Sequence, residues 1–158
     1  MYTKIVSERE LNITIRADEL GVGPNVIGYD PCSISNPVDS DKICEQDYRN
    51  PSLKFYYMNL GKLKKVDKIT KDERDKLMTM FERLYDNGIA YFDVHYDNIM
   101  YGDGLRGEDG PVIIDYGHAL YVEDAFKDSS LIPGWFGNEF SKQNLMDYIY
   151  HELSVFTR

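Results

Sequence analysis

The chain has 158 residues, a length that suits one domain with a single core and is short for two. Hydrophobic residues make up 42% of the sequence and aromatic residues 13%, which excludes a globally disordered protein. The formal net charge is -9, and the only dense basic run is KLKKVDK at residues 62–68, so we expect no nucleic-acid partner, because a phosphate backbone would be repelled.

Targeting signals are not evident in the sequence. No stretch approaches the roughly 20 apolar residues that a membrane helix requires, so we expect no membrane association. The opening residues MYTKIVSERE contain no apolar signal region, and we expect a cytoplasmic or otherwise intracellular protein. Cys32 and Cys44 lie in a polar loop and are expected to be reduced, with a single disulfide across that loop as the alternative.

The first part of the chain is expected to form strands around one helix. The alternating residues 1–6 predict a strand. Ser7 to Glu10 has the S-x-x-E pattern of a capping box, which predicts a helix from about Ser7 to Leu20. Further strands are expected at NVIGY and at the aromatic run LKFYYMNL, with a polar loop from Asp30 to Ser52 between them.

The clearest helix signal follows at the centre of the chain. A second capping box, TKDE at residues 70–73, precedes apolar residues at helical spacing, and Gly88 marks the end of the helix. IAYF and NIMY are expected to pair as short strands around DVHYD, and PVIID is expected to be a buried strand. The last predicted helix is SKQNLMDYIYHEL, with one apolar face formed by Leu145, Tyr148, Ile149 and Leu153.

Polar residues gather in YFDVHYDNIMYGDG, at residues 91–104, and at the end of the strand PVIID. Asp115 ends that apolar strand just before a Gly-containing turn, so its carboxylate is expected to leave the core at a fixed point. Mg²⁺ prefers such oxygen ligands, takes few of them from the protein and leaves positions for phosphate oxygens and water. The pattern therefore indicates a metal site, for which one carboxylate and one amide carbonyl are sufficient.

The segments FDVHYDNIMY and VIIDYG resemble the catalytic loop and the metal-binding loop of the protein-kinase-like superfamily, in which D-x-x-x-x-N is followed by a strand and D-F-G. The loop is more similar to those of small-molecule, lipopolysaccharide and atypical kinases than to H-R-D-L-K. By this resemblance Asp93 would orient and deprotonate an acceptor hydroxyl, and Asn98 and Asp115 would hold Mg²⁺ on the phosphates. His95 would replace the lysine near the transferred phosphoryl group.

Other segments resemble the same superfamily in the same order. YTKIV is similar to the strand with the nucleotide-binding lysine, which would be Lys4, and its glutamate partner would be Glu10 by preference or Glu8. FYYMNLG resembles the strand and hinge against which adenine stacks, which adds Met58 to the nucleotide-binding residues. Asp147 would be the helical aspartate that braces the catalytic loop.

The resemblance implies a minimal protein-kinase-like α+β fold in one domain, residues 1–158. A reduced N-terminal lobe (1–61) would hold a small antiparallel sheet with one helix, and a truncated, mostly helical C-terminal lobe (62–158) would follow. The implied function is phosphotransfer from ATP, with Mg²⁺, to an unidentified hydroxyl acceptor. The sequence starts at the lysine strand and has neither the Gly-rich loop nor an A-P-E segment, so we do not expect it to phosphorylate a protein.

Three other interpretations remain open. The acids and the asparagine could be turn residues, since Asp and Asn favour turns. D-V-H also resembles the D-x-H of dinuclear metallophosphatases, whose later motifs are not present in full. The main alternative is a catalytically weak or inactive pseudokinase that serves as an interaction or scaffold module, for example as a viral structural component, with a partner protein that completes the missing lobe. Four residues are expected to lie outside the site: Asp97, Asp103, His118 and His151.

Overall fold

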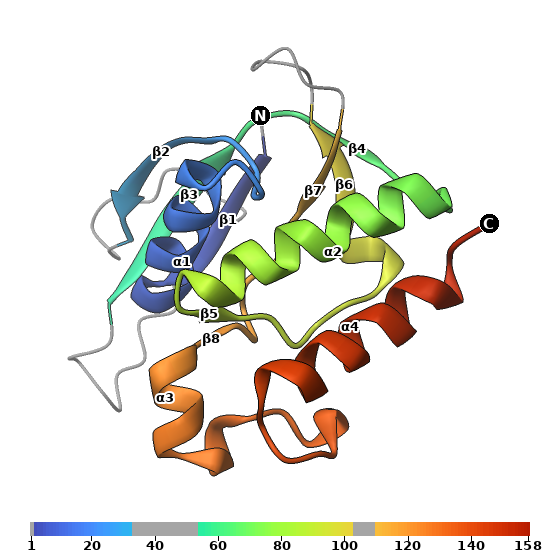
Figure 1. Ribbon diagram of the computed structural model, residues 1–158. Coiled ribbons are helices and arrows are strands. Elements are labelled where there is room, and N and C mark those ends of the chain that lie inside the picture. Colours follow the sequence, from blue (N-terminus) through green and yellow to red (C-terminus); the bar gives the residue numbers. More distant parts are fainter. Residues whose placement is uncertain (1, 33–53, 103–109) are drawn as a thin grey trace.

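The structure is a computed structural model that describes residues 2–32, 54–102 and 110–158 (Figure 1). These residues form a mixed α+β fold with small antiparallel sheets and α-helices, which confirms the expected α+β class. The polar loop between the second and third strands lies almost entirely outside the described residues, and so does Asp103.

The described elements are short strands, α-helices and single 3₁₀ turns. The described α-helices are α1 (Glu8–Glu19), α2 (Lys71–Asp86), α3 (Val122–Lys127) and α4 (Lys142–Val155). The strands are β1 (Tyr2–Ser7), β2 (Val26–Pro31), β3 (Phe55–Leu60), β4 (Leu63–Lys65), β5 (Ile89–Ala90), β6 (Ile99–Gly102), β7 (Pro111–Ile113) and β8 (Leu120–Tyr121). Single 3₁₀ turns occur at Tyr96–Asn98, Ser129–Leu131 and Gly134–Phe136.

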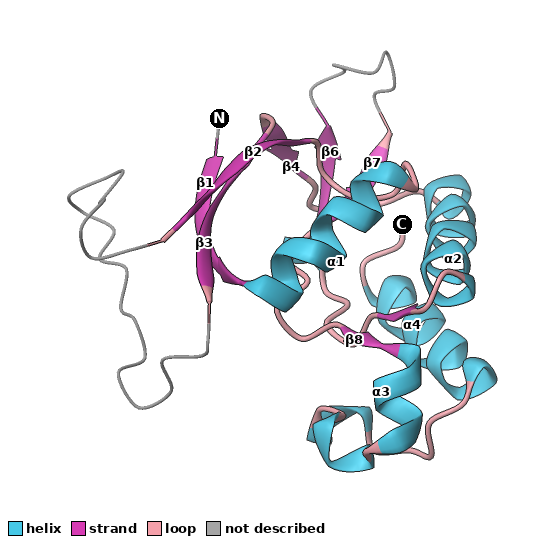
Figure 2. Cartoon of the chain, turned by 90° about the vertical axis from the view of Figure 1, so that its left-hand side faces the viewer, coloured by secondary structure: helices cyan, strands magenta, loops and turns pink. Residues whose placement is uncertain are grey.

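The N-terminal part contains a three-stranded antiparallel sheet in the order β1-β3-β2, as expected. Figure 2 shows α1 between this sheet and the helices α2 and α4. Val6 of β1 and Leu11 of α1 are buried together with Met58 and Leu60 of β3, so the helix is fixed to the sheet by apolar contact. In the register of the sheet Lys4 lies opposite Met58.

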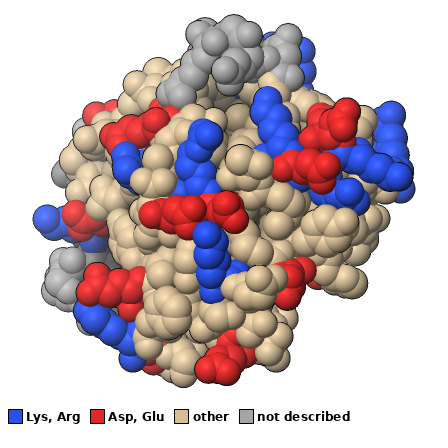
Figure 3. Space-filling model, viewed as in Figure 1, with Lys and Arg blue, Asp and Glu red and all other residues tan. Residues whose placement is uncertain are grey.

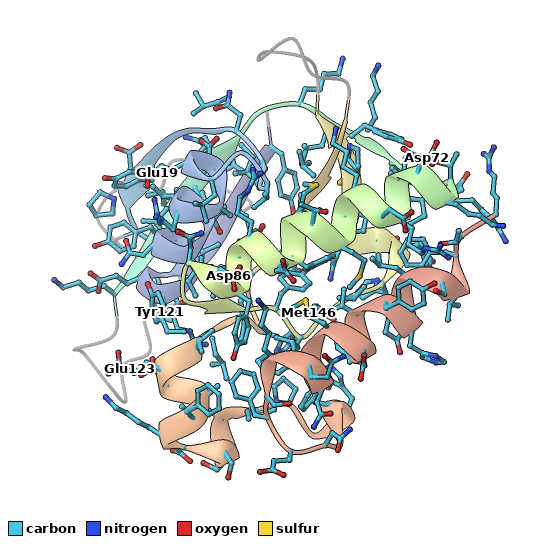
Figure 4. All side chains as sticks on the ribbon, in the orientation of Figure 1. Glu19, Asp72, Asp86, Tyr121, Glu123 and Met146 are labelled. Carbon is cyan, nitrogen blue, oxygen red and sulfur yellow. The ribbon has the colours of Figure 1, made fainter. Side chains whose placement is uncertain are left out.

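Helices α2 and α4 lie side by side and enclose the main core (Figure 1). The capping box that begins α2 is complete: Glu73 N–H donates to the Thr70 hydroxyl, and Thr70 N–H donates to the Glu73 carboxylate. Gly88 has a φ of 87°, a value that favours glycine after a helix end. The side chain of Met146 lies between the two helices (Figure 4).

The buried helix faces agree with the expected ones. On α2 the buried residues are Leu77, Met80, Phe81 and Leu84. On α4 they are Leu145, Ile149 and Leu153, with Tyr148 partly buried on the same side. The helical spacing of apolar residues therefore predicted which faces form the core.

The expected pairing of residues 89–92 with residues 98–101 is wrong. β5 pairs with β8, whereas β6 pairs with β4 and β7. The 3₁₀ turn at Tyr96–Asn98 redirects the chain, and Ile99 then lies opposite Ile113 of β7, where both side chains are fully buried. The lysine-bearing connector also contains a strand, β4, that we did not expect.

The face of the molecule drawn in Figure 3 carries both positive and negative side chains. Lysines and arginines are interspersed with aspartates and glutamates, without a large patch of one sign (Figure 3). None of the helices in the described ranges has the length and apolar character needed to cross a membrane. Cys32 is buried and disulfide-bonded. The expectation that this cysteine is reduced is therefore wrong, and the alternative of a disulfide is confirmed for it.

Candidate functional site

A cavity of about 800 Å³ lies between the β1-β3-β2 sheet and the β4-β6-β7 sheet. Its apolar wall is formed by residues of both sheets and of the segment after β7, namely Met58, Leu60, Leu63, Met100 and Ile114. Four predicted site residues besides Met58 line it: Lys4, Glu10, Asn98 and Asp115. The structure therefore brings together in one cavity predicted site residues that lie up to 111 positions apart in the sequence.

Lys4 is the centre of the charged part of this cavity. Its Nζ lies 2.7 Å from Oε2 of Glu10 and 3.2 Å from Oδ1 of Asp115. Burial alone would lower the pKa of Lys4, but the hydrogen bonds and charges of the two carboxylates outweigh it and raise that pKa above its ordinary value. The lysine is therefore held as a cation.

The start of α1 explains why Glu10, and not Glu8, lies beside Lys4. Ser7 caps the helix by accepting a hydrogen bond from Glu10 N–H at 3.2 Å. The Glu10 side chain does not complete a capping box. It extends to Lys4 on β1, and only 8% of the residue is exposed. One residue thus joins the helix start to the cation in the cavity.

Two buried tyrosines fix the segment that leads to Asp115. Tyr91 donates to the Ile114 carbonyl at 2.5 Å, and Tyr116 donates to the Ile113 carbonyl at 2.9 Å. The two rings meet edge to face at 5.4 Å. Burial raises the pKa of both tyrosines well above the ordinary value, so both hydroxyls remain neutral donors.

Asp115 itself has an uncommon backbone conformation. Its φ is 61°, which is in the left-handed region, and it is the only described residue other than glycine with a positive φ. Its Oδ1 also accepts from Gly117 N–H at 3.2 Å. A β-carbon at Gly117 would lie 3.2 Å from Oε1 of Glu10 and 3.3 Å from Oδ1 of Asp115, so the absence of a side chain there leaves room for both carboxylates.

The loop from Asp93 to Asn98 forms the other side of the site. Asn98 is 4% exposed, and its Nδ2 donates to the Asp93 carbonyl at 2.7 Å. His95 Nδ1 accepts from Asp97 N–H at 3.3 Å, and its Nε2 lies 3.6 Å from Oδ1 of Asp93 and 3.1 Å from Nδ2 of Asn98. The side chains of His95 and Asn98 thus close the turn that carries Asp93, which does not itself line the large cavity.

The bracing of this loop differs from the expected one. The Phe92 carbonyl accepts from Trp135 Nε1 at 2.6 Å and from the Tyr148 hydroxyl at 2.7 Å. Asp147 instead accepts from Gln143 at 2.8 Å on the exposed side of α4. The proposed bracing role of Asp147 is therefore wrong, and Tyr148 braces the loop instead. The helical spacing that placed Tyr148 on the apolar face of α4 was the signal that could have identified it.

Asn98 and Asp115 carry the kinds of oxygen that a small divalent cation prefers. Asn98 lines the cavity, and the contacts of its side chain to the loop are made by Nδ2. Asp115 adds a carboxylate that is 40% exposed. Two protein oxygens suit Mg²⁺. No cluster of three or more His, Cys, Asp or Glu able to hold a metal occurs in the described part of the chain, so a larger protein ligand set is not offered there.

Three further charged residues line the cavity and were not among the predicted site residues. Asp97 lies on its wall, although we expected it outside the site. Lys62 directly precedes β4, and Lys65 is the last residue of β4. The two lysines belong to the basic run noted in the sequence, which was the available signal. His118 and His151 are exposed and do not line this cavity.

A scan against models of protein families matches none of them, and searches of curated proteins and of solved structures find no similar protein. The resemblance to kinases thus depends on the motifs in the sequence.

Proposed function

We propose that the chain has a minimal protein-kinase-like fold and transfers the γ-phosphoryl group of ATP to a hydroxyl acceptor. The observation that carries this proposal is the position of Lys4 between Glu10 and Asp115 in a cavity that Asn98 also lines. One cation and two ligand oxygens at the same cavity match the chemistry of a metal-bound polyphosphate.

The apolar part of the cavity supports a nucleotide rather than a free polyphosphate. Met58, Leu60 and Met100 offer a surface against which a base can stack, next to the charged part. The volume of about 800 Å³ lies within the range of small-molecule sites. Lys62 and Lys65 add positive charge at the same cavity, which favours an anionic ligand.

In the proposed reaction the acceptor oxygen forms a bond to the γ-phosphorus while the bond from that phosphorus to the β–γ bridging oxygen breaks. ADP leaves with the bonding electron pair. Asp93 accepts the proton of the acceptor hydroxyl and later releases it to water. Lys4 neutralises charge on the phosphates, and Glu10 keeps its ammonium group in place.

Asn98 and Asp115 would hold Mg²⁺ beside the phosphates. When bound, the cation supplies positive charge that neutralises the phosphate oxygens as the transfer proceeds. Transfer also requires that Asp93 be held in position. The hydrogen bonds from Trp135 and Tyr148 to the Phe92 carbonyl contribute to this by fixing the residue before Asp93.

The test is thermal unfolding in the presence of Mg²⁺ and ATP. A ligand that binds only the folded state, present at a concentration of about ten times its Kd, should raise the midpoint of thermal unfolding by roughly 3–6 °C in a chain of this size. Asp115→Asn should reduce that rise, because it replaces a negatively charged metal ligand with a neutral amide. No rise at millimolar nucleotide would refute the proposal.

Activity then separates a kinase from a pseudokinase. Asp93→Asn should keep the rise in the midpoint but slow ATP turnover by roughly 100- to 10,000-fold, as expected for loss of a general base. If wild type and Asp93→Asn bind Mg²⁺-ATP alike and show the same residual turnover, the chain binds nucleotide without transferring phosphate and the interaction-module alternative is correct.

A further inference from the structure

We propose that a second pocket, on one face of α2, binds a small ligand that contains several linked phosphate groups. The pocket has a volume of about 360 Å³, which is within the range of small-molecule sites. α2 contributes Lys76, Thr79, Met80 and Arg83, and the turn after α1 and the segment that enters β7 form the other walls. None of its described lining residues also lines the large cavity, so the inference goes beyond the proposed function and does not depend on it.

Two cationic side chains extend from α2 to the segments that form the other walls. Nζ of Lys76 lies 2.9 Å from the position that a β-carbon of Gly110 would take, and this position is open because Gly110 has no side chain. Nη1 of Arg83 donates to the carbonyl of Leu20, at the end of α1, at 3.2 Å. Lys76 and Arg83 are seven positions apart on one face of α2, so their Cα atoms are separated by roughly 10 Å along the helix axis. The pocket thus has two cations about two helical turns apart.

No carboxylate of the described lining neutralises these two cations. The sequence has 27 acidic and 18 basic residues, yet none of the described residues that line the pocket is an aspartate or a glutamate. Within the described ranges neither Lys76 nor Arg83 has a carboxylate at ion-pair distance. Glu82 and Asp86, on the same helix, are paired with Lys142 of α4 instead. Two cations without acidic partners at one pocket favour an anionic ligand.

The separation of the two cations selects the class of anion. A chain of linked phosphates can contact both cations at once, whereas a single phosphate is shorter than the roughly 10 Å between their Cα atoms. The ammonium and guanidinium groups both form charge-assisted hydrogen bonds with phosphate oxygens. Thr79 lies between Lys76 and Arg83, and its hydroxyl, which donates to the Asp75 carbonyl at 3.3 Å, can donate to a central phosphate instead.

Backbone amides of glycine allow binding at this pocket to be followed in the wild-type protein. Gly21 and Gly110 lie on two of its walls, and Gly117 reports on the large cavity, because it lies beside two of the carboxylates there. We would titrate ¹⁵N-labelled protein with sodium tripolyphosphate, without Mg²⁺ and at constant ionic strength, while recording amide chemical shifts. The signals of Gly21 and Gly110 should shift with half-saturation below about 1 mM. No shift, or a shift of Gly117 alone, would overturn the proposal.

The size of the anion provides a second measurement. Inorganic phosphate, titrated under the same conditions, should shift the same two glycine signals at concentrations at least about tenfold higher, because it contacts one cation at a time. Equal affinities for phosphate and tripolyphosphate would show that the ligand does not bridge Lys76 and Arg83, and would contradict the assignment of linked phosphates.

Lys76→Gln should weaken the tripolyphosphate response by about three- to tenfold, as expected for the loss of one charged contact. Lys71→Gln is the matched control, because Lys71 is an exposed lysine of the same helix that does not line the pocket. A loss of the same size in both variants would mean that only the net charge of the protein matters. The titrations of the wild-type protein do not depend on either variant being folded.

Lys4→Met separates this inference from the proposed function. Lys4 lines the large cavity and not the second pocket, so its replacement should leave the response of Gly21 and Gly110 to tripolyphosphate unchanged. If that response disappeared in Lys4→Met, the phosphates would occupy the large cavity and the second site would be refuted. Since no nucleotide or Mg²⁺ is present, failure of this test leaves the kinase proposal standing, and failure of Mg²⁺-ATP to bind leaves this proposal standing.

Discussion

Lys4 and Asp115 are separated by 111 positions in the sequence, and the Nζ of Lys4 lies 3.2 Å from Oδ1 of Asp115. The contact joins the first strand to the segment after β7 across the large cavity. Both side chains are partly exposed, at 31% and 40%, so the ion pair is worth at most about 1 kcal/mol of stability. The ion pair matters because it places a cation, Lys4, next to Asp115, the proposed metal ligand.

Replacing Lys4 should therefore affect ligand binding more than folding. Lys4→Met removes a charged hydrogen-bond donor to phosphate, and we expect the affinity for Mg²⁺-ATP to fall roughly 10- to 100-fold. The control is Lys64→Met, because Lys64 is exposed on β4 but does not line the cavity. Isothermal titration of both variants provides the measurement, and equal affinities would show that Lys4 does not contact the nucleotide.

The second prediction concerns the space beside the two carboxylates. Gly117→Ala places a methyl group 3.2 Å from Oε1 of Glu10 and 3.3 Å from Oδ1 of Asp115, so these oxygens must shift by a few tenths of an ångström. We expect a cost of about 1 kcal/mol in the binding of Mg²⁺-ATP, or about fivefold in affinity. Gly134→Ala is the matched control, since nothing lies within 4 Å of a β-carbon there. A loss of the same size in both variants would contradict this explanation.

The backbone of Asp115 leads to a third prediction, which concerns stability. At a φ of 61° glycine is unstrained and asparagine is tolerated, whereas alanine is not. Among variants that lack the carboxylate, Asp115→Gly should be more stable than Asp115→Ala by about 1 kcal/mol, with Asp115→Asn between them. Urea denaturation of the three proteins measures this order. If alanine proved as stable as glycine, the left-handed conformation would carry no strain.

Much of this site could be predicted from short sequence patterns, because the responsible interactions are local. The caps of α1 and α2 depend on residues three positions apart, and both helices begin where Ser7 and Thr70 predicted. The hydrogen bond from Asn98 to the Asp93 carbonyl closes a single turn, so a short sequence motif could identify this loop. The apolar strand before Asp115 likewise predicted where that carboxylate leaves the core.

The parts that were missed depend on contacts between distant segments. β5 and β8 are two residues long, and Ala90 pairs with Leu120, so no periodicity in either segment could predict the pair. β4 contains two lysines and is formed through its pairing with β6. At the bracing position Asp147 and Tyr148 are neighbours on one helix, and their side chains differ in direction by about 100°. Helix geometry selects Tyr148, whereas the family pattern favoured the aspartate.

This difference provides the fourth prediction. Tyr148→Phe removes the hydroxyl that donates to the Phe92 carbonyl and should cost about 1 kcal/mol of folding stability. Because Phe92 precedes the proposed base Asp93, kcat should fall more than KM rises. Asp147→Asn should leave stability and activity within error of wild type, since its partner Gln143 is on the exposed side of α4. The reverse pattern would restore Asp147 as the bracing residue.

The last prediction is a loss of stability at alkaline pH. Burial raises the pKa of Tyr91 and Tyr116 well above the ordinary value, and the hydrogen bond to Glu73, followed by burial, raises the pKa of Tyr101 to about 12. The folded state therefore keeps protons that the unfolded chain releases near pH 10, so it binds more protons than the unfolded state in that range. By linkage the free energy of unfolding is unaffected by these groups below about pH 10 and falls as the pH rises toward 12.

Absorbance of tyrosinate during an alkaline titration tests this assignment. Of the 13 tyrosines, Tyr91 and Tyr116 should ionise only when the protein unfolds, so a step in absorbance should coincide with the loss of circular dichroism. Tyr91→Phe should reduce that step by the contribution of one tyrosine. Tyr29→Phe should leave it unchanged, because Tyr29 is 52% exposed in the folded protein. A smooth titration without a step would mean that both hydroxyls reach solvent before unfolding, and that the support of Asp115 by Ile113 and Ile114 is weaker than their hydrogen bonds indicate.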